Sequence, residues 1–138
     1  MIKRVFVDSD VILDVALARM PFLEHSKMLL SMLENGLAIG FVSANSIANI
    51  YYILRKAGDD VKARFFISSI LKYLMVIPSN HANILDALKS DFSDFEDAIQ
   101  NFSALENQCE CIVTRNVEDY KTSTLDVYVP LEFLNLFQ

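Results

Sequence analysis

The sequence predicts an α/β fold of three layers, in which helices cover both faces of a parallel sheet of about five strands. Short runs rich in β-branched and aromatic residues alternate with longer segments whose apolar residues recur at helical spacing. Crossover connections between parallel strands produce this alternation. The 138 residues include only 3 Gly and 3 Pro, which leaves little room for interdomain linkers. We therefore expect a single domain over residues 1–138.

The N-terminal part of the chain predicts two strands and two helices. β-branched and aromatic residues that end in polar ones indicate a buried strand over residues 3–7. A helix over residues 10–19 should follow, and Pro21 separates it from a second helix over residues 22–35, which stops at an Asn-Gly pair. The next strand is expected over residues 37–42.

The middle of the chain predicts two helices and the third strand. The segment 46–56 is apolar almost all round and stops before Gly58, so we expect a largely buried helix. A helix over residues 59–73 should follow, because an aspartate stands at its start and apolar residues recur at helical spacing. Residues 75–77 then predict a short strand, which Pro78 ends.

The C-terminal part predicts three helices and two strands. A Ser-Asn pair can cap a helix that runs to Leu88, and residues 94–107 carry one apolar stripe typical of a packed helix. Strands are expected over residues 109–113 and 126–129. Pro130 is well placed to begin a short terminal helix.

Charge and composition exclude some functions but do not select one. The net charge is −6, yet residues 1–78 hold 9 Lys and Arg against 7 Asp and Glu, whereas residues 79–138 hold 3 against 11. One half could therefore contact phosphates while the other holds cations. The basic start is followed by an apolar run that stops at Asp8, and no stretch approaches the roughly 20 apolar residues of a membrane span. We expect a cytoplasmic protein with no membrane association.

Acids, amides and hydroxyls follow three of the expected strands. In open parallel sheets, ligands bind beyond the carboxyl ends of the strands, near the switch in strand order. The helix over residues 94–107 carries Asp94 and Asp97 on one side, and a helix start close to the first strand would direct Asp97 toward Asp8. The candidate residues are Asp8, Ser9 and Asp10 after the first strand, Ser43, Asn45 and Asn49 after the second, and Thr114, Arg115, Asn116 and Asp119 after the fourth.

Carboxylates gathered at one sheet edge predict a cation. They repel each other, and their pKa values rise unless a cation lies among them. Oxygen ligands select a hard divalent ion such as Mg²⁺ or Mn²⁺. With a substrate phosphate in its coordination shell, such an ion can support the breakage of a phosphodiester. Cys109 and Cys111 have no further cysteine or suitably spaced ligand, so a thiolate metal site is not expected.

Plainer interpretations of the same residues stay open. Asp8 or Asp10 could cap the first helix, and Asp94 could cap its own helix. Asp14 could be an exposed helical acid. The remaining choices concern Arg115, which could contact phosphate or pair with Glu118, and Ser9 and Thr114, whose hydroxyls could line a pocket or bond to the local backbone.

Three motifs, in this order, resemble those of PIN domains, the fold of VapC-type toxin ribonucleases. The stretch Asp8-Ser9-Asp10-Val11-Ile12-Leu13-Asp14 resembles the family's opening Asp-Thr-Asn-Val-x-x-Asp element. Asp94-Phe95-Glu96-Asp97 is similar to the start of the central acidic helix. Ile112-Val113-Thr114-Arg115-Asn116, followed by Asp119-Tyr120, is similar to the Thr-Arg-Asn…Asp-Phe element. The resemblance spans nearly the whole chain.

The resemblance implies a ribonuclease that depends on Mg²⁺ or Mn²⁺, acts on RNA, is held in check by an antitoxin and forms a homodimer. By position, Asp8, Asp97 and Asp119 would be the metal ligands, and these three with Asn116 the catalytic set. Substrate contacts would come from Ser9, Asn49, Thr114 and Arg115. The chain departs from the family where Asn49 replaces a usual glutamate and Asn116 a frequent aspartate. An amide brings no charge and cannot act as a base, so a metal would be held more weakly.

Two other classes of function compete with the nuclease. The first is a degenerate PIN domain that binds RNA or a protein partner without cutting, which the amides at residues 49 and 116 favour. The second is a haloacid-dehalogenase-type phosphatase, because Asp8-Ser9-Asp10 also fits that superfamily's Asp-x-Asp nucleophile element. The order of the later motifs disagrees with the phosphatase, and no aspartate ends the third strand as a phospho-receiver domain would require.

Overall fold

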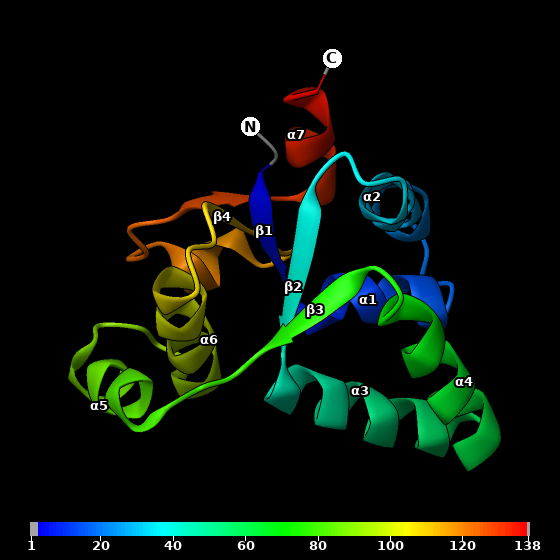
Figure 1. Ribbon diagram of the computed structural model, residues 1–138, viewed down its shortest axis with the longest axis horizontal. Coiled ribbons are helices and arrows are strands. Elements are labelled where there is room, and N and C mark those ends of the chain that lie inside the picture. The colour runs from blue at the N-terminus through cyan, green and yellow to red at the C-terminus, as the bar shows by residue number, and fades with distance from the viewer. Residues whose placement is uncertain (1–2, 138) are drawn as a thin grey trace.

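The computed structural model describes residues 3–137 and contains a parallel five-stranded sheet between two layers of helices (Figure 1). The strand order is β3-β2-β1-β4-β5, so the first strand lies in the middle. All four strand pairs are parallel, which confirms the predicted fold class. The strands are β1 (Arg4–Val7), β2 (Ile39–Ser43), β3 (Leu74–Ile77), β4 (Cys111–Val113) and β5 (Asp126–Tyr128).

The helices lie where the sequence pattern predicts them, with bounds that differ by a few residues. One short 3-10 helix, η1 (Val117–Tyr120), was not expected, because four residues carry too little periodicity to be recognised. The others are α1 (Ser9–Ala16), α2 (Leu23–Glu34), α3 (Ala44–Ala57), α4 (Asp60–Ile70), α5 (His81–Lys89), α6 (Phe95–Glu106) and α7 (Pro130–Asn135).

The pleat of the central strand sends alternate side chains into two separate cores. Val5 and Val7 pack with α1, α2, α3, α4 and α7 on one face of the sheet. Phe6 packs on the other face with Ala104 of α6 and Tyr120 of η1. Figure 1 shows α6 on one side of the sheet and α1 to α4 on the other. Both cores therefore meet at β1, whose carboxyl end carries the first acidic residues.

Helix α3 is less buried than its composition predicts. Only Ser46, Ile50 and Leu54, spaced four residues apart, are buried, and Tyr52 on the opposite side keeps 64% of its surface exposed. The expectation of a largely buried helix is wrong because α1 and α4 cover one face of α3 and leave the other uncovered. Within residues 3–137, the helices are too short or too polar to cross a membrane.

Candidate functional site

Three neighbouring strands end at the same edge of the sheet and place polar residues side by side. Asp8 follows β1, Ser43 ends β2 and Thr114 follows β4. Val7 and Val113 are partners in the β1–β4 register, and the Asp8 backbone N–H donates to the Val113 carbonyl at 3.0 Å. Because β1 and β4 are neighbouring parallel strands, Asp8 and Thr114 lie next to each other just beyond their ends.

Asp8 is buried at this edge and accepts hydrogen bonds on both carboxylate oxygens. Oδ1 accepts from the Ser9 backbone N–H at 2.8 Å, so Asp8 is the N-cap of α1. Oδ2 accepts from the hydroxyls of Thr114 at 2.9 Å and Tyr120 at 3.2 Å. Asp8 thus caps the helix and belongs to a cluster that includes residues more than one hundred positions away.

Asp97 approaches Asp8 through the start of α6. Asp94 caps this helix as anticipated, because its Oδ1 accepts from the Asp97 backbone N–H at 2.9 Å. The Tyr120 hydroxyl oxygen lies 3.2 Å from Asp97 Oδ1 and 3.2 Å from Asp8 Oδ2. The two carboxylate oxygens are therefore no more than twice that distance apart, close enough for one or two cations to link them.

A buried polar chain ties Asp97 to the end of β2. The Ser43 hydroxyl donates to Ser46 Oγ at 2.9 Å, and the Ser46 hydroxyl donates to Gln100 Oε1 at 2.9 Å. Gln100 Nε2 lies 3.4 Å from Asp97 Oδ1. All three linking residues are at most 2% exposed, so water does not compete for these bonds. The chain restricts the position of the Asp97 carboxylate.

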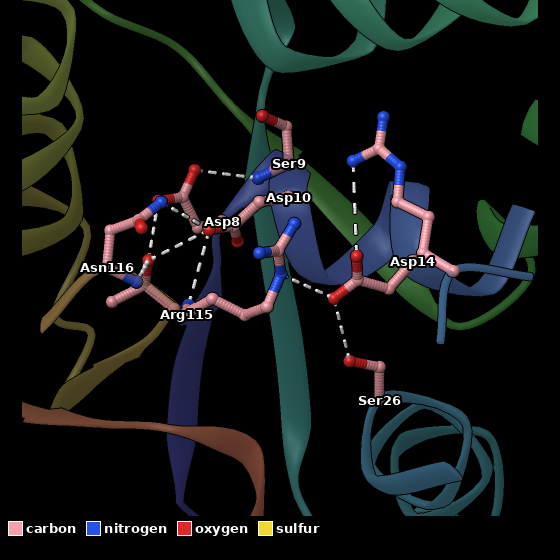
Figure 2. Close-up of polar contacts among 9 residues, drawn as sticks. Asp8, Ser9, Asp10, Asp14, Ser26, Arg115 and Asn116 are labelled. Atoms are coloured by element: carbon pink, nitrogen blue, oxygen red, sulfur yellow. Dashed lines mark hydrogen bonds and ion pairs between the residues drawn. The ribbon is translucent and has the colours of Figure 1, made fainter. Parts of the chain in front are cut away.

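Asp10 faces the loop after β4. Its Oδ2 accepts from the Asn116 side-chain amide at 2.9 Å and from the Arg115 backbone N–H at 3.3 Å (Figure 2). Its Oδ1 is buried and has no hydrogen-bond partner among residues 3–137. A buried carboxylate oxygen without a donor is costly unless a cation or water meets it.

Asp14 lies one turn further along α1 and is fully buried, so the interpretation as an exposed acid is wrong. Its Oδ2 accepts from Arg115 Nε at 2.8 Å and from the Ser26 hydroxyl at 3.3 Å (Figure 2). Arg19 lies 3.9 Å from Oδ1. Arg115 therefore pairs with Asp14 rather than with Glu118, because the fold turns its side chain toward α1.

Burial and mutual repulsion make several of these carboxyls weak acids. Burial raises the pKa of Asp8 above its usual range. Burial, followed by the charge of Asp8, raises the pKa of Asp10 to about 7. Burial and the charges of Asp8 and Asp94 raise the pKa of Asp97 to about 7. The negative charge of Asp119 adds to the rise at Asp8 and Asp97. Such carboxyls gain most from a bound cation.

The other predicted site residues take different positions around the cluster. Asp119 lies half-buried in η1, near enough for its charge to act on Asp8 and Asp97. Asn116 is exposed and bonds to Asp10, and the half-buried Ser9 contributes its backbone N–H to Asp8. Asn49 is exposed on α3, and in the described part of the chain it has no hydrogen bond to the cluster. A role for Asn49 stays a prediction.

The acidic cluster fits a divalent ion that also needs oxygens from elsewhere. No group of three or more His, Cys, Asp or Glu side chains between residues 3 and 137 is placed to hold a metal ion by itself. Asp8 and Asp97 nevertheless converge on the Tyr120 hydroxyl, and Asp10, after the same strand, has a buried oxygen without a hydrogen-bond partner in the described residues. Mg²⁺ is usually bound by one or two carboxylates, with waters and substrate phosphates completing its shell. The donor set agrees with that chemistry.

Two residues of the site, Tyr120 and Gln100, were not among those predicted to act in it, whereas Asp10 was both a candidate site residue and a possible helix cap. Asp8 takes the role of the cap and leaves Asp10 free to face the loop. Tyr120 stands where the resembled motif has phenylalanine, and its added hydroxyl was the available signal. Gln100 lies one helical turn after Asp97, on the same side of α6, a spacing that could have identified it.

Comparisons with known proteins agree with this geometry. A family model described as "PIN domain" matches residues 4–118. Ribonuclease VapC1 of Aquifex aeolicus is 27% identical over 136 residues, which cover 95% of this chain and 93% of that protein. This relative and the family model together argue against the phosphatase alternative.

Solved structures with the same fold include toxin–antitoxin proteins. The structure of VapBC-1 from nontypeable Haemophilus influenzae aligns with a TM-score of 0.69 and 14% identity, covering 93% of this chain and 98% of that one. A toxin–antitoxin complex from Klebsiella pneumoniae aligns with a TM-score of 0.67 and 19% identity, covering 91% and 97%. At these identities the likeness shows the fold alone. The PIN domain model matches most of the length of this chain, and the three motifs of the sequence predicted the same family. The chain therefore belongs to the PIN domain family.

Proposed function

We propose that this chain is a metal-dependent endoribonuclease of toxin type, similar to VapC, that hydrolyses RNA phosphodiester bonds. The observation that carries the proposal is the convergence of Asp8 and Asp97 on the Tyr120 hydroxyl. Two separated segments of the chain thereby place weakly acidic carboxyls at the carboxyl edge of the sheet, where α/β folds bind ligands. The 27% identity to a ribonuclease supports the same reaction.

Each residue of the cluster has a proposed part in this reaction. Asp8 and Asp97 would hold Mg²⁺ or Mn²⁺, and Asp119, expected as a third ligand, would add its negative charge from η1. The bound ion would supply activation of water and stabilisation of the charge that develops on the phosphate. Thr114 fixes the Asp8 carboxylate, and Asn116 donates to Asp10. Ser9, Asn49 and Arg115 are the proposed contacts to RNA, since each can donate a hydrogen bond to a phosphate or sugar oxygen. Thr114, expected among these contacts, is fully buried and already donates its hydroxyl to Asp8, so its proposed part is to position that carboxylate.

RNA cleavage by matched variants tests this function. Asp8→Asn and Asp97→Asn keep the side-chain volume but remove a charge, and each should lower cleavage in Mn²⁺ or Mg²⁺ by more than the roughly 10- to 100-fold cost of losing an outer-shell partner of a metal. Asp86→Asn, at an exposed acid of α5, is the matched control and should cleave like the wild type. Equal cleavage by all four proteins would refute the proposed nuclease.

A second candidate is a PIN domain that binds RNA or a protein without cutting it. Two observations favour this alternative. Between residues 3 and 137, no three acids are placed to hold a metal ion by themselves, and the chain has amides at Asn49 and Asn116 where the family often has acids. Calorimetry separates the two functions. Binding of Mn²⁺ that Asp8→Asn weakens supports the nuclease, whereas no Mn²⁺ binding up to millimolar concentration, together with retained RNA binding, supports the non-cutting domain.

We further propose that the protein assembles with an antitoxin and as a homodimer. Solved structures of the same fold include toxin–antitoxin complexes. Tyr52 on α3 and Val61 on α4 keep 64% and 75% of their surface exposed, and exposed apolar side chains of this size are available for protein contacts. Light scattering on the isolated protein should give twice the 15.7 kDa chain mass. A mass equal to one chain would exclude the homodimer.

A further inference from the structure

A cavity of about 380 Å³ adjoins the acidic cluster and shares one residue with it. Arg115 contributes its backbone N–H to Asp10 in the cluster and its side chain to the wall of the cavity. The opposite walls come from the start of α2, through Phe22 and His25, and from the start of α7, through Leu131. The volume falls within the range of small-molecule binding sites.

The polar part of the wall is held in place from behind. Arg115 Nε donates to the fully buried Asp14 at 2.8 Å, and the same carboxylate oxygen accepts from the Ser26 hydroxyl at 3.3 Å (Figure 2). The guanidinium carbon lies 4.0 Å from the centroid of the Phe22 ring. A planar cation is therefore fixed against an aromatic ring that is itself 40% exposed.

We propose that this cavity receives a nucleobase of the RNA strand whose phosphodiester lies at the acidic cluster, an inference that rests on the function proposed above. Unstacked bases bind on aromatic rings and on guanidinium planes, and Phe22 and Arg115 supply one of each. A phosphate bound at Asp8 and Asp97 is covalently joined to a nucleotide that must lie next to the acidic cluster. Arg115 contacts the cluster and lines the cavity, so the cavity is in the right place for the base of that nucleotide.

Charge favours RNA over an apolar peptide as the occupant. Arg115 and Arg19 both lie within 4 Å of Asp14, so two guanidinium groups share one buried carboxylate. Arg115 places its positive charge in the wall of the cavity, which suits a polyanion better than an apolar peptide. His25 adds ring nitrogens that can hydrogen-bond to the edge of a base.

Nucleotide binding in the absence of metal tests the inference separately from catalysis. In EDTA, the four ribonucleoside 5′-monophosphates and ribose 5-phosphate are titrated into the millimolar range against the ¹⁵N-labelled protein. At least one nucleotide should shift the Arg115 Nε–H signal and the His25 and Leu131 amides in a saturable way, and ribose 5-phosphate should not. Equal shifts with ribose 5-phosphate, or no shift with any nucleotide, would overturn the inference.

Matched phenylalanine variants locate the binding. Phe22→Leu keeps an apolar side chain but removes the ring, and it should weaken nucleotide binding by about fivefold or more. Phe65→Leu, at an exposed phenylalanine on α4, should leave the affinity unchanged. Leu131→Glu places a negative charge at a 44% exposed position in the wall and should weaken binding without disturbing a buried residue. Unchanged affinity in Phe22→Leu and Leu131→Glu would refute the subsite.

The outcomes separate this inference from the proposed function. Saturable nucleotide binding at the cavity by a protein that cleaves no RNA would leave the subsite standing and remove the nuclease. RNA cleavage with the same site preference in the wild type and Phe22→Leu, without nucleotide binding at the cavity, would do the reverse. An apolar peptide that binds at these signals when no nucleotide does would assign the cavity to a protein partner instead.

Discussion

At the scale of single residues, the site contains aspartates of two different kinds. Asp8, Asp10 and Asp97 are surrounded mainly by neutral donors and by each other, and burial raises the pKa of each. Asp14 is the most deeply buried, but Arg115 and Arg19 compensate its charge. Among residues 3–137 the first kind has no ion pair with a lysine or arginine and is suited to receive a cation, whereas the second serves the structure.

Asp14→Asn should destabilise the protein strongly. The change leaves the guanidinium of Arg115, whose side chain is only 23% exposed, without its partner at 2.8 Å. Breaking a buried pair from one side costs about 3 kcal/mol or more. Urea unfolding at neutral pH measures the loss, with Asp86→Asn as the exposed control. A free energy of unfolding within 0.5 kcal/mol of the wild type, the usual range for a surface change, would contradict the pairing.

Tyr120→Phe should raise the pKa of Asp97 further. The Tyr120 hydroxyl stabilises the ionised Asp97 and lowers the pKa that burial has raised, so its removal favours the protonated form. Carbon-detected NMR titration of the Asp97 carboxyl in EDTA measures the shift. A pKa that stays the same or falls would show that the hydroxyl does not bridge Asp8 and Asp97.

Residue roles divide into those that local sequence reveals and those that it does not. Asp94 is a cap because it precedes an apolar stripe, and its hydrogen bond to the Asp97 N–H is local. The partner of Asp14 is 101 residues away in the chain, and the Tyr120 contact with Asp8 spans 112. A single sequence has no periodicity that connects such pairs, so the burial of Asp14 could not be predicted from it.

At the scale of elements, β2 and α2 depend on a glycine for their close approach. A Cβ atom on Gly40 would collide with Leu74 Cδ2 and lie 2.8 Å from Leu33 Cδ1. Both leucines are buried, so neither side chain can move away freely. Gly40 therefore determines how closely α2 packs on the sheet.

Gly40→Ala should lower the free energy of unfolding by about 1–3 kcal/mol, the usual cost of overpacking a core. Thermal or urea unfolding measures it. Gly58→Ala is the control, since its nearest neighbour would be the Leu54 carbonyl at 3.6 Å, an ordinary contact. A Gly40→Ala protein as stable as the wild type would mean that β2 and α2 are further apart than the structure places them.

Element type was predictable from periodicity, whereas element environment was not. All five strands, and every helix longer than η1, were predicted to within a few residues, because capping residues and prolines mark the ends of these elements. Helix α3 was expected to be buried because apolar residues surround it. Its actual exposure depends on which neighbours pack against it, and neighbours are a property of topology rather than of local sequence.

At the scale of the whole molecule, the strand order decides where the acids meet. With β1 between β2 and β4, the ends of three strands and the start of α6 share one edge. The general rule for parallel sheets predicts that edge from the sequence, and the motif order predicts Asp8 and Asp97 as neighbours there. The direction in which each side chain points, such as that of the exposed Asn49, could not be predicted from the strand order.

The acidic edge should make the metal-free protein less stable as pH rises. The pKa values of Asp10 and Asp97 are about 7 in the folded state, against a usual value of 3.8, so the folded state retains protons that the unfolded state has lost. Their contribution to stability is full below about pH 4 and disappears as pH rises through 7.

Urea unfolding in EDTA at several pH values between 5 and 8 tests this. The free energy of unfolding of the wild type should fall over this range, and Asp10→Asn/Asp97→Asn should flatten the fall. Mn²⁺ should restore stability at the upper end of the range, where the carboxylates are ionised. A wild-type stability that rises with pH in EDTA, or a slope that the double variant retains, would contradict the raised pKa values.

The central claim is that Asp8 and Asp97 together hold a divalent cation, and crystals soaked in Mn²⁺ test it most directly. Anomalous difference density should appear at the carboxyl edge of the sheet, within bonding distance of a carboxylate oxygen from each residue, and should be lost in Asp8→Asn crystals. Crystals with ordered Asp8 and Asp97 side chains but no anomalous peak between them, or with Mn²⁺ bound only elsewhere, would contradict the account.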